Sequence, residues 1–277
     1  MFVIYKISFH NIHRFPFFLP ARPIIRGMGT LFKIGYGIRA AFACGMSALF
    51  APQNCLSCGD FCTYLPLCAR CRSELESGIA PKERRCTFCG RILISEKESC
   101  LECREAKLFT FCDGAFPLYP YVLWKKELLF RWKMAGSRSL SPFFARVLFR
   151  VLQRYYEGFT VIPVPPRPGK IKKTGWDQIA DLCRYLRGLY GVRVCRALVR
   201  MGTQQQKKLG RSERLRRLGK QYALKSAFKK AACAQKLPHQ AVLLDDIMTT
   251  GVTLETCAAL LKEAGVQKVY ALTLFAC

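Results

Sequence analysis

The sequence predicts an α/β fold, a mostly parallel sheet flanked by helices, with a small metal-binding module on its N-terminal side. Two observations carry this prediction. From about residue 116, apolar segments with strand and helix periods alternate along the chain, which is typical of such sheets. Before them, residues 55–103 hold four Cys-x2-Cys pairs with polar, turn-rich spacers. Because this segment is too polar for a hydrophobic core, bound metal would have to stabilise it.

The length and composition favour a folded protein of one large or two smaller domains. The 277 residues are 51% hydrophobic, enough to bury a substantial core. Residues 1–45 show no sustained period, whereas Met46 starts a segment that leads directly into the first cysteine pair. We therefore expect translation to start at Met46 and residues 1–48 to be a non-native or disordered extension. Residues 49–111 would form the metal-binding module, and residues 112–277 the α/β domain.

The net charge of +27 indicates an anionic partner, either nucleic acid, a phosphorylated metabolite or a membrane surface. Most of this charge lies in residues 161–240, where 20 Lys and Arg face 3 Asp and Glu. A solvated basic face is the alternative interpretation. No apolar run approaches the roughly 20 residues that a membrane helix needs, so we expect no transmembrane segment.

The expected elements of the α/β domain follow one another along the chain. Apolar residues at helical spacing predict a helix that begins at Ser141-Pro142 and includes Phe144, Val147 and Val151. Further helices are predicted at residues 177–189 and 253–264, and strands at residues 160–164, 192–199, 241–244 and 269–275.

The segment from Val242 to Leu261 combines a buried strand, two acids and a helix start. Asp245 and Asp246 follow the strand, at the edge where open α/β sheets bind ligands. A hydroxyl-rich loop then leads into an amphipathic helix, and it consists of Thr249, Thr250, Gly251, Val252 and Thr253. The unpaired N–H groups and the dipole of that helix start favour a phosphate, which Gly251 lets the backbone approach closely. The two acids can accept hydrogen bonds from ribose hydroxyls or help to hold a cation.

This segment resembles the signature of type I phosphoribosyltransferases, in which four hydrophobic residues and two acids precede a T-T/S-G-x-T phosphate loop. The resemblance implies that Asp245 and Asp246 act as the catalytic acids and hold the ribose hydroxyls of phosphoribosyl pyrophosphate, with Mg²⁺. It also implies that Thr249 through Thr253 hold the 5′-phosphate.

From about residue 49 to the end, the chain resembles the ComF family of competence-associated proteins. The matching segments are the cysteine pairs from Cys55 to Cys103, Arg131 to Gly136, Pro163-Val164-Pro165, Thr174 to Gln178, and Thr203 to Arg217. The resemblance implies contacts to pyrophosphate or DNA from Lys133, Pro165, Arg167, Lys173, Gln178, Gln205 and Arg214. It implies a cytoplasmic protein that handles single-stranded DNA in natural transformation, with a DNA-uptake helicase or other competence proteins as partners.

Three positions depart from the family pattern. Thr174 stands where the family usually has Arg, Trp176 where it has Phe, and Asp177 where it has Asn. The missing arginine removes a planar bidentate contact to pyrophosphate, and Lys170, Lys172 or Lys173 could replace its charge but not its geometry.

The cysteine spacing predicts two structural zinc ions rather than disulfides. No convincing export signal precedes the cysteines, so a reducing cytoplasm with metal-bound thiolates fits better than a secreted chain. A two-residue gap lets both thiolates of a pair reach one tetrahedral ion, and Gly after the second cysteine permits a tight turn. We expect a double zinc-ribbon module with sequential sets, and an interleaved pairing stays open. The two sets are Cys55, Cys58, Cys68 and Cys71, and Cys86, Cys89, Cys100 and Cys103.

Three functions follow from these features. The first is a DNA-uptake protein whose site binds a phosphoribosyl group or a DNA 5′-phosphate. Trp176 or Tyr222 would be available for base stacking, and ordinary packing is the alternative for Trp176. The second is a metabolic phosphoribosyltransferase of the nucleotide-salvage type, an enzyme that would work by positioning and electrostatics. The third is a regulatory binder without turnover. We lean towards phosphoribosyltransferase activity, with the acceptor left open.

Overall fold

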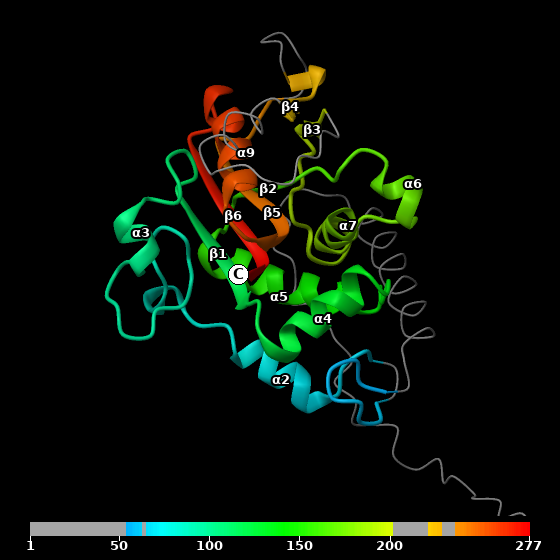
Figure 1. Ribbon diagram of the computed structural model, residues 1–277. Helices are drawn as coiled ribbons and strands as arrows, with labels where there is room; N and C mark the ends of the chain where they lie inside the picture. The colour runs from blue at the N-terminus through cyan, green and yellow to red at the C-terminus, as the bar shows by residue number, and fades with distance from the viewer. Residues whose placement is uncertain (1–53, 63–64, 202–220, 229–235) are drawn as a thin grey trace, which may run out of the picture.

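The computed structural model describes residues 54–62, 65–201, 221–228 and 236–277, without the side chains of Leu123, Trp124, Lys172 and Lys173. At its centre is a parallel four-stranded sheet with the strand order β1-β6-β5-β2 (Figure 1). The strands are β1 (Gly114–Pro120), β6 (Lys268–Ala276), β5 (Gln240–Met248) and β2 (Thr160–Pro163). The predicted parallel sheet is therefore confirmed.

The two central strands are buried on both faces, as expected for parallel strands that helices cover. Val242, Leu243 and Leu244 of β5 are all fully buried, and Leu244 lies opposite Leu272 of β6. The apolar run that predicted this strand therefore forms the middle of the core.

Helices cover both faces of the sheet. One face packs against α4 (Leu123–Lys133), α5 (Leu140–Tyr155) and α7 (Gln178–Tyr190), and the other against α9 (Val252–Glu263) (Figure 1). Phe144, Val147 and Val151 are buried on α5, as their helical spacing predicts. Asp177 begins α7, because its carboxylate accepts the N–H of Ala180 at 2.9 Å.

The strand predicted at residues 192–199 forms only in part. Val194 makes a parallel bridge to Val161 of β2, after which the chain leaves the sheet. β3 (Leu198–Arg200) then pairs antiparallel with β4 (Tyr222–Leu224) in a separate two-stranded sheet. The ladder beside β2 stops because Pro163, the last residue of β2, has no N–H donor, and neither do Pro165 and Pro166 after it.

The remaining short elements lie at the N-terminal module and at the loops. They are α2 (Ala69–Ser77), η1 (Lys82–Arg84), α3 (Leu101–Glu105), α6 (Lys170–Thr174) and η2 (Ser226–Phe228). None of the helices among the described residues is both long and apolar enough to cross a membrane.

The N-terminal module covers the outer edge of β1 (Figure 1). The N–H of Ala115 donates to the carbonyl of Phe88 at 3.1 Å. Arg85 is almost fully buried and donates to the carbonyl of Pro117 at 2.6 Å, with its guanidinium 4.1 Å from the ring of Phe116. Burial lowers the pKa of Arg85 to about 10. The module therefore caps an edge strand that would otherwise expose unpaired backbone groups.

The described part of the module forms no hydrophobic core of its own, as its polar spacers predict. Cys55, Cys71 and Leu75 instead join the core on the α5 side of the sheet. Cys89 and Cys103 join the core on the α9 side. The two cysteine clusters are thus built into opposite faces of the α/β domain.

Candidate functional site

The two acids lie on β5 itself, because this strand runs to Met248 and not only to Leu244 as predicted. The pairing with β2 ends at Leu244, while the pairing with β6 continues through Asp245 and beyond. Asp245 and Asp246 therefore occupy a stretch of β5 with a neighbouring strand on one side only. This is the kind of crevice at the carboxyl ends of strands where α/β sheets bind ligands.

Lysine side chains from two other elements converge on the acids. Lys133, the last residue of α4, forms an ion pair with Asp246, with 2.5 Å between Nζ and Oδ2. Gln178 at the start of α7 donates to the carbonyl of Lys133 at 3.0 Å and accepts from Lys170 at 2.5 Å. The sequence-predicted residues Lys133, Gln178 and Asp246 are thus brought together, and Lys170 contacts this group through Gln178.

Asp245 has an unusual acidity. Burial and the neighbouring carboxylate of Asp246 raise the pKa of Asp245 to about 8, against the opposing effect of Lys133 and Lys170. Its Oδ1 accepts the N–H of Asp246 at 2.8 Å. A carboxyl that resists ionisation in the free protein gains most from a bound cation, which would restore the negative form.

The Asp245→Asn variant is expected to be more stable than the wild type in the absence of ligand, and the difference is expected to be larger at pH 8 than at pH 5. The folded-state pKa lies above the unfolded value of 3.8, so the folded protein retains a proton that the unfolded chain releases. Stability from this group is therefore lost as the pH rises from about 4 to about 8. Urea unfolding of both proteins at pH 5 and pH 8 measures the difference, and a pH-independent difference would contradict the assignment.

The predicted phosphate loop joins β5 to α9. Gly251 is the N-cap of α9 with φ of 68°, a left-handed conformation that favours glycine. Thr249 and Thr250 are exposed, so their hydroxyls are available to a ligand. Val252 and Leu254 are buried and anchor the first turn of α9. The N–H groups at the start of α9 and the exposed hydroxyls of the loop are together suited to bind a phosphate.

The linker after the second cysteine cluster packs directly against this loop. A Cβ atom on Gly251 would lie 2.9 Å from Cε1 of Phe109 and 3.2 Å from Cδ2 of Leu108. One turn further along α9, the buried carboxylate of Glu255 accepts the N–H groups of Thr110 at 2.7 Å and Phe111 at 2.9 Å. A third N–H, that of Cys112, donates to the same carboxylate at 3.1 Å.

Sequence reasoning missed Phe109 and Glu255. Glu255 lies 145 residues from Thr110, and an acid in the first turn of a helix is ordinary, so no local signal marks it as buried. Through Phe109 and Glu255, the loop contacts the linker that follows the second cysteine cluster.

The eight paired cysteines form two clusters, and the sequential sets are confirmed. In each cluster the four Sγ atoms lie within 4.8 Å of one another. The closest contacts between pairs are 3.6 Å, from Cys58 to Cys68 and from Cys89 to Cys100. Gly59 and Gly90 follow the first pair of each cluster with φ of 81° and 70°, which permits the tight turn that the spacing predicts.

The second pair of each cluster lies at the start of a helix, which sequence analysis did not predict. Cys68 is the N-cap of α2 and Cys100 is the N-cap of α3. Each cluster therefore combines a turn with a helix start, where N–H groups favour thiolates.

The thiol chemistry fits zinc. Although burial opposes it, hydrogen bonds from backbone N–H groups lower the pKa of Cys55 to about 6 and that of Cys86 to about 7. Burial raises the pKa of Cys71 to about 12 and that of Cys103 to about 11. Each cluster thus has one thiol that ionises readily and others that need a positive charge nearby. Four sulfurs within 4.8 Å of one another around a divalent cation would meet that need, as in structural zinc sites.

The two aromatic residues considered for base stacking are buried. Trp176 is 9% exposed and packs edge-on against Trp132, with the guanidinium of Arg138 5.0 Å from its ring. Tyr222 is 3% exposed. The packing alternative therefore holds for Trp176, and stacking on either ring would need a rearrangement.

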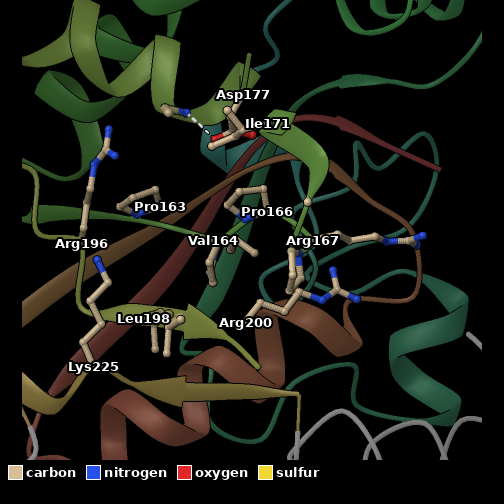
Figure 2. Close-up of a pocket in the computed structure, with 15 residues that line it drawn as sticks. Pro163, Val164, Pro166, Arg167, Ile171, Asp177, Arg196, Leu198, Arg200 and Lys225 are labelled. Atoms are coloured by element: carbon tan, nitrogen blue, oxygen red, sulfur yellow. Dashed lines mark hydrogen bonds between the residues drawn. The ribbon is translucent and has the colours of Figure 1, made fainter. Parts of the chain in front are cut away.

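The other predicted contact residues are divided between the site and a neighbouring pocket. Pro165 and Arg167 line a pocket beside β2 (Figure 2). Gln205, Arg214 and the side chain of Lys173 lie outside the described residues. Thr174, at the usual position of an arginine, donates its hydroxyl to the carbonyl of Lys170 at 2.9 Å and is not a cationic contact.

Among known proteins, the chain is similar in sequence to a competence protein. The competence protein ComFC of Streptococcus pneumoniae (strain ATCC BAA-255 / R6) is 26% identical over 187 residues, which cover 62% of this chain and 78% of that protein. A solved hypoxanthine phosphoribosyltransferase from Staphylococcus aureus shares 15% identity with a TM-score of 0.30, over 50% of this chain and 64% of the enzyme. No family model matches the chain.

The resemblance to the ComF family that the motifs indicate agrees with the sequence similarity to ComFC. The ComFC similarity, the two four-cysteine clusters and the parallel sheet with its signature loop occur in one chain. In these three features the chain is similar to the ComF family.

Proposed function

We propose that this protein binds phosphoribosyl pyrophosphate, or a related ribose 5-phosphate group, with Mg²⁺ at Asp245 and Asp246. The phosphate would lie on the loop from Thr249 to Thr253. The proposal extends to a role in the uptake or processing of single-stranded DNA during natural transformation, which the name of the ComFC relative supports.

One observation carries the binding proposal. Asp245 and Asp246, with Lys133 paired to Asp246, stand on the same strand–loop–helix unit as the hydroxyl-rich loop. The lysine and a bound Mg²⁺ would neutralise the acids while the helix start holds the phosphate. In a transferase, such an arrangement would stabilise the positive charge that develops on the ribose as pyrophosphate departs.

Titration with phosphoribosyl pyrophosphate and Mg²⁺ tests this proposal. The wild type is expected to bind, and the Asp245→Asn, Asp246→Asn double variant to lose at least about tenfold in affinity because both carboxylates disappear. Substituting Asp60→Asn, at an exposed acid in the N-terminal module, is the matched control. Equal affinity in all three proteins would remove the proposal.

A metabolic phosphoribosyltransferase is the second candidate, favoured by the pocket that adjoins the acids. Val164 lines this pocket and donates its N–H to the carbonyl of Leu244, one residue before Asp245. Release of pyrophosphate from phosphoribosyl pyrophosphate in the presence of an acceptor would favour this function. Salt-dependent DNA binding without turnover would favour the role in DNA uptake.

Single-stranded DNA is expected to bind through the basic segment 170–217, much of which lies outside the described residues. Backbone phosphates should dominate, because the segment carries no base-reading motif. If about five phosphates are neutralised, log affinity should fall with log salt at a slope of roughly −3.5. Alanine at Lys207, Lys208, Arg211 and Arg214 should flatten that slope without changing the zinc content. Affinity that does not depend on salt would count against DNA as the partner.

A further inference from the structure

The pocket beside β2 is separate in its chemistry from the acidic site. It has a volume of about 340 Å³, within the range of small-molecule sites. It lies between the proline-rich segment that follows β2 and the β3–β4 sheet (Figure 2). The pocket opens where the chain leaves the edge of β2 after Val194, so its walls come from two different sheets.

The wall of this pocket is apolar. Pro163, Val164, Pro166 and Leu198 contribute to it, and Val164 and Leu198 are themselves buried. Proline rings and branched side chains offer flat, rigid surfaces without hydrogen-bonding groups. Such surfaces favour a ring or another unsaturated, planar group.

The rim is strongly basic. Arg167 and Arg200 lie at one end of the pocket, and Arg196 and Lys225 at the other (Figure 2). Within the described part of the chain, no ion pair is found for Arg167, Arg196 or Lys225. The Nε atom of Arg200 is buried without a hydrogen-bond partner among the same residues.

Among the described residues that line the pocket, Asp177 is the one acid, and it already has hydrogen-bond partners. The carboxylate of Asp177 accepts the N–H of Ala180 at 2.9 Å and the ammonium of Lys170 at 3.1 Å. It therefore cannot neutralise the four cations of the rim. The pocket is left with an excess of positive charge over an apolar wall, which selects an anionic ligand.

We propose that this pocket holds the acceptor of the transfer reaction, and that the acceptor is a planar ring that carries a carboxylate. This inference rests on the proposed function, because an acceptor needs the phosphoribosyl group bound at Asp245 and Asp246. The ring would pack on Pro163, Val164 and Leu198, and its carboxylate would pair with cations of the rim. Lys170 links the two sites, since it contacts Asp177 of the pocket and acts electrostatically on Asp245.

Calorimetric titration with two matched probe pairs tests the assignment. The pairs are orotate against uracil and anthranilate against aniline, each the same ring with and without a carboxylate. We expect the carboxylates to bind about tenfold more tightly, because a charge-assisted contact adds to the packing of the ring. The Arg196→Gln, Lys225→Gln double variant should reduce their affinity to that of the neutral rings. Lys268→Gln, which removes an exposed charge at the amino end of β6, should leave it unchanged.

Phosphoribosyl pyrophosphate affinity, measured on the same proteins, separates this inference from the proposed function. If neither carboxylate binds better than its neutral partner, or if the double variant binds both as well as the wild type, the pocket assignment is wrong. In that case unchanged phosphoribosyl pyrophosphate binding leaves the proposed function standing. A third outcome is that the protein binds the carboxylates through Arg196 and Lys225 but does not bind phosphoribosyl pyrophosphate. This result would show that the pocket binds anions, and it would refute its role as an acceptor site.

Discussion

Cys89→Ser is expected to lower the zinc content from two ions to one and to destabilise the α/β domain as well as the N-terminal module. Structural zinc contributes on the order of 10–16 kcal/mol of binding free energy in small peptides. Sequence analysis alone suggests that chelation would unfold the module and leave the α/β domain standing. The structure changes this expectation, because Cys89 and Cys103 share a core with Leu254 and Ala258 of α9.

Loss of zinc from the second cluster should also weaken binding at the proposed phosphate site. The linker from Leu108 to Cys112 follows the second cluster and packs against Gly251 and Glu255. When the cluster loses its metal, this support is released, and phosphoribosyl affinity should fall together with the zinc content. Zinc analysis, thermal unfolding and phosphoribosyl pyrophosphate titration measure the three consequences.

Two cysteine variants serve as controls for this experiment. Cys277→Ser removes an exposed thiol outside both clusters and should leave two zinc ions bound. Cys58→Ser disrupts the first cluster, which joins the opposite core, and should affect phosphoribosyl binding less than Cys89→Ser. A Cys89→Ser protein that loses one zinc ion but keeps the stability and affinity of the wild type would show that the cluster and the loop are independent.

Gly251→Ala is expected to destabilise the folded protein by roughly 2–5 kcal/mol and to weaken phosphoribosyl binding. The left-handed backbone at φ of 68° costs an L-residue about 1–2 kcal/mol. The added Cβ would also stand 2.9 Å from Phe109, and overpacking of this kind costs about 1–3 kcal/mol. Urea unfolding gives the stability, and titration gives the affinity.

Gly265→Ala is the matched control, because Gly265 has φ of 93° but nothing within 4 Å of the added Cβ. It should show the backbone cost alone and leave ligand binding unchanged. Combining Gly251→Ala with Phe109→Leu should recover part of the packing cost, which a double-mutant cycle isolates. If Gly251→Ala and Gly265→Ala lower the free energy of unfolding by the same amount, the close contact between Phe109 and the loop does not affect stability.

The local motifs could be predicted from the sequence because their chemistry depends on close spacing. The two-residue gap and the following glycine indicate that both thiols of one Cys-x2-Cys pair can bind the same ion, while the structure decided which two pairs come together. The apolar run of β5, the two acids and the loop from Thr249 to Thr253 are adjacent in the chain, so they are also neighbours in the folded protein. Helical spacing likewise identified the buried residues of α5 and α9.

The tertiary structure decided which distant residues meet. Lys133 pairs with Asp246, and Glu255 binds the linker at Thr110, across more than a hundred residues in each case. The burial of Trp176 and the departure of the chain from β2 after Val194 likewise depend on neighbours remote in sequence.

Contacts of this kind depend on how layers pack, and no spacing within one segment encodes them. The sequence by itself therefore determined the chemistry of the two cysteine clusters and of the proposed phosphate loop. Only the packed structure joined the second cluster to that loop, because the side chain of Phe109 and the carboxylate of Glu255 meet their partners only when α9 lies against the linker.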